Sequence, residues 1–384
     1  MKILMVNDYP LDSYYIQWQK GLTPSQQLWG KVEIDKGKGI ELIILPHVKY
    51  TFLNKIGNAI HIEHLDQQIR ALFHLKEIDV IYAPFAAATT KFLLILKLLG
   101  IVKTPIVAMI HYPLLGSSSD KKIVRWLGRK LINGYDRMLF ISQNILIDNI
   151  DAFSLSPEES QQKFVHLNWG AETDFYQQPM QFNVPVKEEY FVTSGQTDRD
   201  FDTLIEAFRH IDFKLKIYAK PGFTSKSKDI PKNVEIYTKV ISSKEIIDIY
   251  KNSRAALICF KMTQKSTLGI TVLFDVMAIG KPVIITENSY IDIDVEKEGI
   301  GFWVPEGYVH GWVSKINKLI DDPELCNTLG KRAFSLHKST YNMNNFAESL
   351  KMVFQNLHLE KEGGNKNEVN GKIHSKNILE KAEL

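Results

Sequence analysis

At 384 residues, the chain is long enough for two domains of ordinary size. Hydrophobic residues make up 45% of it and charged residues 24%, which is typical of a globular protein and not of a disordered or membrane-spanning one. Its 47 basic and 44 acidic side chains leave a net charge of +3, which does not favour a nucleic-acid-binding function.

Short apolar strands are predicted to alternate with longer amphipathic helices along the chain. In the first half, the predicted strands are residues 2–6, 41–45, 80–83, 106–110, 137–141 and 164–167. In the second half they are residues 190–193, 215–219, 234–237, 255–260 and 282–286, with helices over 202–210, 243–252, 269–279, 309–320 and 323–337. This alternation predicts an α/β fold with two Rossmann-like domains that face each other across a cleft.

The two halves are separated by a proline-bearing, helix-poor stretch, which places the linker near residues 177–188. Residues 360–384 are polar and poor in large apolar side chains, so we expect a mobile tail. Because ligands of open parallel sheets bind at the carboxyl ends of the strands, the functional residues should lie in strand-to-helix loops.

The two cysteines, Cys259 and Cys326, are too few for a disulfide scaffold or a cysteine-based metal site and indicate a reducing compartment. Residues 1–6 are too few for the apolar region of a signal peptide, and the apolar run 92–102 is too short to cross a bilayer. These features predict a cytoplasmic protein.

The segment 265–284 is the most informative part of the sequence. A polar loop leads into a helix predicted to begin near Gly269, where the unpaired amides of Leu268, Gly269 and Ile270 would form an anion site. Asp275 lies about one and a half turns into that helix, within reach of the ribose of a nucleotide whose phosphate binds there. The alternative is an ordinary β-α turn with a solvated Asp275.

Residues 277–284 read Met-Ala-Ile-Gly-Lys-Pro-Val-Ile, and this segment resembles the signature of the group 1 glycosyltransferases, retaining enzymes with the GT-B fold. In that family two Glu residues, separated by seven others, precede such a sequence. Asp275 takes the place of the second Glu, which binds the donor ribose. Thr267, with Ser266 beside it, takes the place of the first Glu, which contacts the donor sugar near the reacting centre. This substitution is the main departure from the family pattern.

Residues 194–208 resemble the family's Gly-Arg loop and the helix after it, where an Arg and a Lys neutralise the donor diphosphate. Gln196 replaces that Arg, and Arg199 matches the Lys, so the resemblance implies that Arg199 stabilises the leaving diphosphate. The alternative is a solvent-facing arginine beside a helix-capping aspartate. Lys220 is a weaker phosphate candidate, and its alternative is a lysine of a surface turn.

Three further positions follow from the same resemblance. Residues 233–250 resemble the segment that holds the nucleobase, through main-chain groups near Lys239 and Val240. His111 follows a predicted strand where the family keeps a histidine near the donor sugar, although a histidine there can equally be structural. Gly21 lies in an early loop whose backbone would approach the donor phosphate or the acceptor.

The resemblance implies an acceptor-side domain over residues 1–180, a donor-binding domain over 186–340 and a helix over 341–358 that crosses back to the N-terminal domain. It implies metal-independent, retaining transfer of a sugar from a nucleotide-diphosphate donor to a hydroxyl of a glycan or lipid-linked acceptor, with no cofactor. Asp292 and Asp294 are interpreted as a solvated turn and not as a metal site.

The first half also carries a set of basic residues interleaved with apolar ones: Lys91, Lys97, Lys103, Lys121, Lys122, Arg125, Arg129 and Lys130. Such a surface fits peripheral contact with anionic lipids at the inner face of the membrane, and solvated helix faces are the alternative. Two other functions stay open: a non-catalytic nucleotide-sugar-binding relative or partner subunit, and a sugar-nucleotide epimerase.

Overall fold

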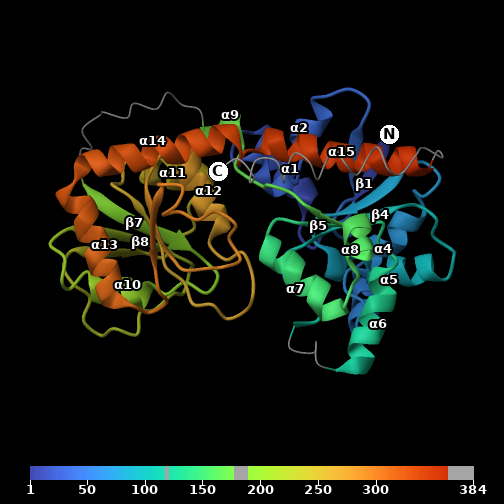
Figure 1. Cartoon of the computed structure of the whole chain (residues 1–384), viewed down its shortest axis with the longest axis horizontal. Helices are drawn as coiled ribbons and strands as arrows, with labels where there is room; N and C mark the ends of the chain where they lie inside the picture. Colours follow the sequence, from blue (N-terminus) through green and yellow to red (C-terminus); the bar gives the residue numbers. More distant parts are fainter. Residues whose placement is uncertain (117–120, 177–188, 362–384) are drawn as a thin grey trace. The chain divides into compact units, whose positions relative to one another are not determined.

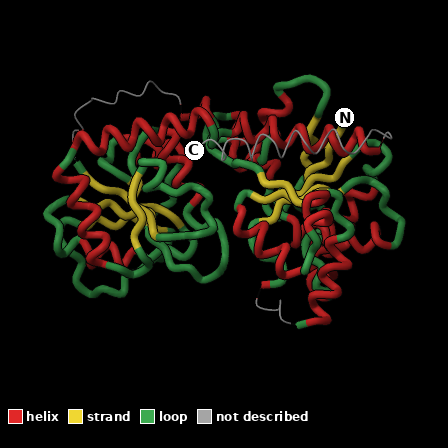
Figure 2. The backbone as a smooth tube through the Cα atoms, in the orientation of Figure 1, coloured by secondary structure: helices red, strands yellow, loops and turns green. Residues whose placement is uncertain are grey.

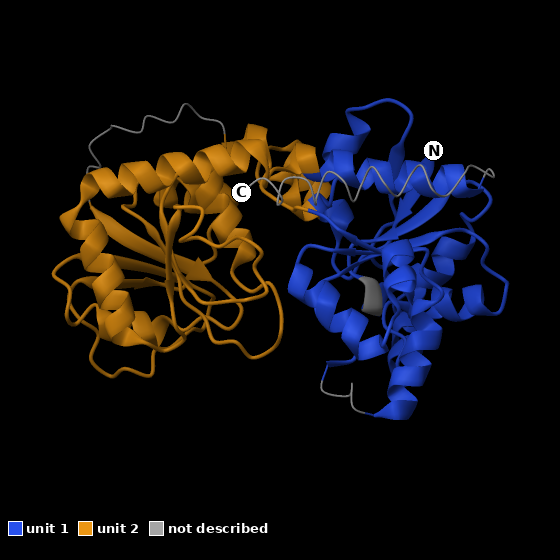
Figure 3. Cartoon of the chain, in the orientation of Figure 1, with its two compact units in different colours: residues 1–13, 28–167, 346–384 blue, residues 14–27, 168–345 orange. Residues whose placement is uncertain are grey.

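The computed structural model describes residues 1–116, 121–176 and 189–361 (Figure 1). The chain divides into two compact units (Figure 3): unit 1 is residues 1–13, 28–167 and 346–384, and unit 2 is residues 14–27 and 168–345. In this division residues 14–27 and 168–176 group with the second unit, whereas the predicted first domain was residues 1–180. The predicted linker and most of the predicted tail lie outside the described residues.

Unit 1 is built on a parallel six-stranded sheet in the order β2-β1-β3-β4-β5-β6. Its strands are β1 (Lys2–Met5), β2 (Glu41–Ile44), β3 (Val80–Ala83), β4 (Ile106–Ile110), β5 (Arg137–Phe140) and β6 (Phe164–His166). Every residue of the central strands β3 and β4 is buried, as expected where helices cover both faces of a parallel sheet.

Unit 2 contains a second parallel six-stranded sheet, in the order β12-β11-β10-β7-β8-β9. Its strands are β7 (Tyr190–Gly195), β8 (Lys214–Ala219), β9 (Val234–Tyr237), β10 (Ala256–Ile258), β11 (Val283–Thr286) and β12 (Gly301–Val304). All but β12 coincide with strands predicted from the sequence. The two sheets confirm the predicted α/β fold class.

Helices surround the strands of each unit (Figure 2). Those from the first half of the chain are α1 (Leu11–Gln19), η1 (Ser25–Leu28), α2 (Lys31–Asp35), α3 (Thr51–Ala59), α4 (Leu65–Leu72), α5 (Ala86–Leu98), α6 (Lys122–Ile132), α7 (Gln143–Phe153) and α8 (Pro157–Lys163). Those from the second half are α9 (Thr173–Tyr176), α10 (Phe201–Ala207), α11 (Ser243–Lys251), α12 (Ile270–Ala278), α13 (Val309–Asp321), α14 (Pro323–Ser339) and α15 (Met343–Lys361).

The core of unit 2 lies where α10 and α13 pack against the sheet, around the fully buried Trp312. In unit 1, α15 contributes Phe346, Leu350 and Phe354, all of them buried. The Phe354 ring meets that of Tyr82 in β3 with 5.4 Å between ring centroids. The last helix therefore supplies part of the core of a unit whose other elements are far away in sequence.

Candidate functional site

The expected donor-binding residues of unit 2 follow strands that all end at the same edge of the second sheet. They are Gln196 and Arg199 after β7, Lys220 after β8, Lys239 and Val240 after β9, and Ser266, Thr267, Leu268, Gly269 and Ile270 after β10. Strands β7 and β10 are neighbours in the sheet. From β7 the chain continues outward through β8 and β9, and it then returns to the other side of β7 and continues outward through β10, β11 and β12. The strand order therefore reverses between β7 and β10. Ligands of parallel α/β sheets bind outside such a point.

Arg199 has unmet hydrogen-bonding capacity at this edge. Its Nε and Nη1 atoms are buried and have no hydrogen-bond partner among the described residues. Gly195, at the end of β7 with a φ of 143°, makes room for the guanidinium, since a Cβ atom there would lie 1.8 Å from Nε. Burial lowers the pKa of Arg199, and the nearby Tyr250, Cys259 and Asp198 oppose that effect. The group is thus a buried cation with two donors available to an anion.

The loop that carries Arg199 is held to the end of β10 by main-chain hydrogen bonds. The amide of Asp200 donates to the carbonyl of Cys259 at 3.1 Å, and the amide of Lys261 donates to the carbonyl of Asp198 at 2.9 Å. Because both flanks of Arg199 are fixed in this way, its backbone is positioned before any ligand binds.

The loop before α12 is shaped by Gly269 and Asn288. Gly269 has a φ of 95°, and a Cβ atom there would lie 2.8 Å from the ring of Phe260, so only glycine fits without strain. The buried Asn288 donates to the carbonyls of Ser266 and Leu268 at 3.0 and 3.1 Å. These contacts fix the loop that holds Thr267, whose side chain is partly exposed.

One part of the predicted anion site at this helix is wrong. The amide of Ile270 is not unpaired, because it donates to the carbonyl of Thr267 at 3.1 Å in the turn that starts the helix. Leu268 and Gly269 remain the candidate amide donors at this position.

Asp275, the expected ribose ligand, lies in a hydrogen-bonded cluster within unit 2. Its Oδ1 atom accepts from Tyr176 Oη at 2.5 Å and from Gln26 Nε2 at 2.8 Å. Burial raises the pKa of Asp275 to about 7, and the two hydrogen bonds oppose that rise. The carboxyl group is therefore not solvated, which contradicts the alternative left open by the sequence, and it already has two partners within unit 2.

Gly21 belongs to the segment 14–27, which is anchored in unit 2 through Glu172. The Glu172 carboxylate accepts from the Ser25 amide at 2.6 Å and from Trp18 Nε1 at 3.3 Å. Gly21 has a left-handed φ of 63°, and a Cβ atom there would lie 4.0 Å from Nζ of Lys244 at the start of α11. The early loop thus lies beside the segment that follows β9.

Lys220, Lys239 and Val240 are exposed at the same sheet edge as Arg199. Val240 keeps 82% of its surface in contact with solvent, which leaves an apolar side chain available to cover a flat ring. Ser242, two residues later, caps α11 by accepting from the Glu245 amide at 3.3 Å. The cap fixes the end of the loop that carries Lys239 and Val240.

His111 lies at the carboxyl end of β4 in unit 1, packed among aromatic rings. Its ring stacks on Phe85 with 4.2 Å between centroids and meets Trp29 edge-on at 5.1 Å. Nε2 lies 2.7 Å from the Pro84 carbonyl, and since a carbonyl only accepts, Nε2 carries the proton. Burial lowers the pKa of His111 to about 4, so at neutral pH the ring is uncharged and Nδ1 is an acceptor.

Asp8, at the carboxyl end of β1, is a candidate ligand-binding residue that the sequence analysis missed. Its Oδ1 atom is buried with no hydrogen-bond partner among the described residues, and burial raises its pKa. Burial also raises the pKa of Tyr112, after β4, and the negative charges of Asp8 and Glu63 add to that rise. A lone aspartate after an N-terminal strand has no distinctive spacing, so only the folded chain singles it out.

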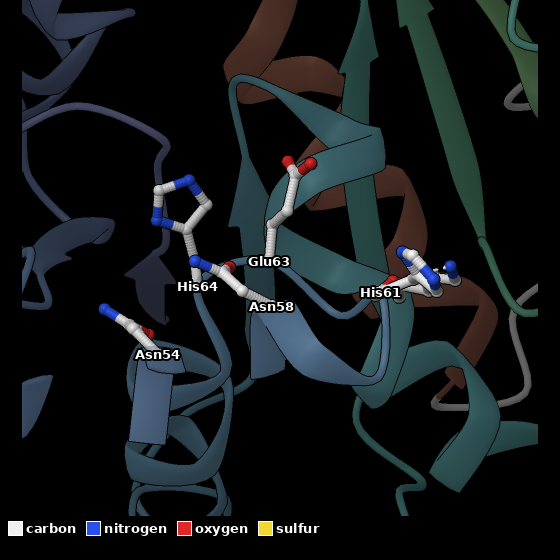
Figure 4. A pocket seen from close by; sticks show the side chains of 6 residues that line it. Asn54, Asn58, His61, Glu63 and His64 are labelled. Atoms are coloured by element: carbon white, nitrogen blue, oxygen red, sulfur yellow. Dashed lines mark hydrogen bonds between the residues drawn. The ribbon is translucent and has the colours of Figure 1, made fainter. Parts of the chain in front are cut away.

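A polar pocket of about 680 Å³ lies in unit 1 beside the turn between α3 and α4 (Figure 4). It is lined by Asn54, Asn58, His61, Glu63, His64 and Lys91. His61 and His64 have left-handed φ angles of 57° and 50°, which residues other than glycine adopt only at a cost in conformational energy. Gly57 allows this tight turn, since a Cβ atom there would lie 2.3 Å from the Ile62 carbonyl oxygen.

The lining of this pocket carries both hydrogen-bond donors and hydrogen-bond acceptors. Its amide and imidazole groups both donate and accept, the Glu63 carboxylate accepts and the Lys91 ammonium donates, which is what the hydroxyl groups of a sugar require. Among the described residues, no group of three or more His, Cys, Asp or Glu side chains is arranged to hold a metal ion.

Comparison with known families identifies the region that contains the β7 and α12 loops. Residues 174–335 match the family model described as "Glycosyl transferases group 1". This region is a group 1 glycosyltransferase domain. It contains Arg199, Thr267, Gly269 and Asp275, so the resemblance inferred from residues 265–284 is confirmed. No curated protein sequence matches the chain.

Solved structures of similar fold match nearly the whole chain. Sucrose-phosphate synthase from Thermosynechococcus elongatus is 12% identical with a TM-score of 0.63, and the match covers 94% of this chain and 100% of that one. Anabaena HepE in complex with UDP-glucose is 15% identical with a TM-score of 0.62, covering 92% and 99%. WaaG, a glycosyltransferase involved in lipopolysaccharide biosynthesis, is 13% identical with a TM-score of 0.56, covering 92% and 99%.

At these identities the comparison concerns the fold, and it confirms the GT-B fold class. The family match concerns residues 174–335, so a group 1 glycosyltransferase domain lies within a chain of GT-B fold.

Proposed function

We propose that the chain transfers a sugar, of hexose type, from a nucleotide-diphosphate sugar to a hydroxyl of a glycan or lipid-linked acceptor, with retention and without a metal ion. The observation that carries the donor half of this proposal is Arg199, a buried guanidinium with two unpaired nitrogen atoms at the carboxyl edge of the second sheet. A ligand with dense negative charge, such as a diphosphate, would satisfy both.

The chemistry assigned to this residue is electrostatic. As the bond between the sugar and the diphosphate breaks, negative charge grows on the leaving oxygen. A fixed cation at that position stabilises the transition state more than the ground state. The Arg199 backbone is held by the end of β10, so little reorganisation is needed when the charge develops. Arg199 is therefore proposed to do what a metal ion does in metal-dependent transferases.

The other donor contacts are proposed from position. Gln196, Lys220 and the amides of Leu268 and Gly269 would surround the diphosphate, with Gly21 in the neighbouring loop. Lys239 and Val240 would hold the base. Ser266 and Thr267 would contact the donor sugar, and Asp275 the ribose, in exchange for its present partners Tyr176 and Gln26.

His111 is proposed as the contact in unit 1 for a hydroxyl of the donor sugar. Its proton is committed to the Pro84 carbonyl, so Nδ1 can accept a hydrogen bond but the neutral ring cannot act as a general acid at that atom. Asp8 and the polar pocket at the turn between α3 and α4 are proposed to bind hydroxyl groups of the acceptor, in keeping with the 1–180 acceptor-side assignment.

Two relatives suggest which compounds to try first. HepE was solved with UDP-glucose, and WaaG acts in lipopolysaccharide biosynthesis. UDP-sugars as donors and lipid-linked glycans as acceptors are therefore the first compounds to test. The proposed location of the reaction is the cytoplasm, at the inner face of the membrane.

The test is incubation of the protein with UDP-, GDP- and ADP-sugars, with and without candidate acceptors, and measurement of nucleoside diphosphate release. A transferase releases the diphosphate faster with acceptor, and Arg199→Ala should abolish that release. An epimerase would change the donor sugar without releasing it. Nucleotide binding without either reaction would indicate a non-catalytic nucleotide-sugar-binding relative. This is the second candidate function, and it is favoured by Thr267 in place of the family's Glu.

A further inference from the structure

Helix α6 is apolar on two sides, and one side is covered by unit 1. Val124, Gly128 and Ile132 lie on the inner side, and Ile132 is fully buried at 3% exposure. A Cβ atom on Gly128 would lie 2.9 Å from the side chains of both Leu115 and Phe153, so this side is tightly packed. The helix therefore needs no further apolar residues to hold it to the unit.

The outer side of α6 nevertheless carries an apolar stripe at helical spacing. Ile123, Trp126 and Leu127 expose 70%, 58% and 55% of their surfaces. Single exposed apolar residues are common, but three large ones on one face of a short helix are characteristic of an interaction site.

The neighbouring helix also exposes apolar side chains near its end. α5 packs against α6, and Lys97 near the end of α5 forms an ion pair of 2.6 Å with Asp136, just beyond the end of α6. The last residues of α5 and the turn after it expose Leu98 (48%), Leu99 (68%) and Ile101 (62%). We call these three, together with Ile123, Trp126 and Leu127, the α5–α6 apolar surface.

Basic residues accompany this surface. Residues 91–130 contain eight Lys or Arg and one acidic residue, Asp120, whereas the whole chain has a net charge of only +3, so the rest of the chain is net negative. Lys103, Lys121, Lys122 and Lys130 are exposed. Lys130 reaches over the Trp126 ring with 5.8 Å from Nζ to the centroid, so its ammonium group lies beside the exposed indole.

We propose that the α5–α6 apolar surface docks on a membrane containing anionic lipids, with Trp126 and Leu127 at the boundary between headgroups and acyl chains and the lysines against the phosphates. A protein partner would need matching acidic and apolar groups, whereas an anionic bilayer supplies both everywhere. Among the described residues, no helix is long and apolar enough to span a bilayer. The docking goes beyond the proposed function, because it needs neither donor nor acceptor.

The test is co-sedimentation of the full-length protein with vesicles of phosphatidylcholine alone or mixed with phosphatidylglycerol. Binding is expected to the mixed vesicles only and should weaken as salt is raised. Trp126→Ser with Leu127→Ser should reduce the partition coefficient by about a hundredfold or more, because two large apolar side chains no longer leave water on binding. Lys121→Glu with Lys122→Glu should reduce it by at least about thirtyfold, at about 1 kcal/mol for each lysine charge removed.

Matched controls come from other exposed positions. Phe52→Ser in α3 removes an apolar side chain that is 57% exposed, and Lys228→Glu reverses an exposed charge in unit 2. Both should bind as the native chain does. Quenching of tryptophan fluorescence by brominated lipid should be largely lost in Trp126→Phe.

Three results overturn the proposal. One is equal binding to neutral and anionic vesicles, and another is unchanged binding by the serine variant. The third is a native dimer in sedimentation without lipid that the serine variant converts to a monomer, because a second copy of the chain would then cover the surface. None of these outcomes depends on nucleotide binding, so they leave the proposed sugar transfer untouched.

Discussion

Arg199→Met is expected to make the ligand-free protein more stable while destroying its affinity for a nucleotide diphosphate. Methionine keeps the length and most of the apolar stem of arginine but has no donors to leave unpaired. Each buried, unpaired donor costs about 1–3 kcal/mol, and Arg199 has two, Nε and Nη1. Part of this gain is lost to imperfect packing of the new side chain, so we expect a net stabilisation of about 2 kcal/mol.

For a unit of this size, that stabilisation corresponds to a rise of about 4–8 °C in the Tm of the ligand-free protein. A nucleotide at a hundred times its Kd should stabilise the native chain by about 2.7 kcal/mol. Loss of two charge-assisted hydrogen bonds, at about 1.5–3 kcal/mol each, should weaken that binding at least a hundredfold. The variant should therefore show almost no Tm shift with the same nucleotide.

The assay is a thermal melt with and without UDP, GDP or ADP, followed by calorimetric titration of the nucleotide that binds. The matched control is Arg209→Met, in the same unit, because Arg209 is exposed and already hydrogen-bonded to Glu206 and Asp229. It should give no rise in Tm and should keep the nucleotide shift. A ligand-free Tm below that of the native chain, or an unchanged nucleotide shift in Arg199→Met, would refute the reasoning.

Three further predictions concern the residues around the two sheet edges. Gly269→Ala should lower stability by about 2–3 kcal/mol, because the φ of 95° and a Cβ 2.8 Å from the Phe260 ring both disfavour a side chain; a denaturant titration with no change in Cm would contradict this. Asp275→Asn should flatten the pH dependence of the free energy of unfolding. Because the pKa of Asp275 is raised in the folded chain, the native protein loses at most about 4 kcal/mol of stability as pH rises from about 4 to about 7. Urea melts across that pH range should show a smaller loss in the variant. His111→Gln should lower kcat/KM without removing any pH transition between 5 and 8, since the His111 ring is already neutral there; loss of a transition in the variant's pH profile would show that the ring titrates in catalysis.

The fold could be predicted from the sequence because its signals are local. Strands such as residues 106–110 are continuous apolar runs, and runs of this kind form strands that are buried on both faces. The edge strand β12 was the exception, since Gly301–Val304 is short and contains a glycine, which weakens a strand pattern.

Some parts of the candidate site were also within reach of the sequence. The positions of Arg199 and Gly269 after parallel strands follow from chain order alone, because the carboxyl ends of all parallel strands in a sheet lie at one edge. The left-handed φ of Gly269 is, by contrast, a feature of the folded chain, since the residue before a helix usually has an extended backbone.

The hydrogen-bonding state of these residues was decided by tertiary structure. Asp275, the expected ribose ligand, accepts a hydrogen bond from Gln26, which is 249 positions away in the chain, while burial raises the pKa of its carboxyl group. Asp8 drew no notice in the sequence, yet folding leaves one of its oxygens buried without a partner.

The physical reason lies in the range of the interactions. Apolar periodicity and backbone conformation depend on neighbours a few positions apart, so they can be read along the chain. Burial and hydrogen-bond satisfaction depend on whichever residues folding brings together. The sequence of this protein thus determined which loops form the candidate site. Only the tertiary structure decided that Arg199 keeps two unpaired nitrogen atoms whereas Asp275 already accepts two hydrogen bonds.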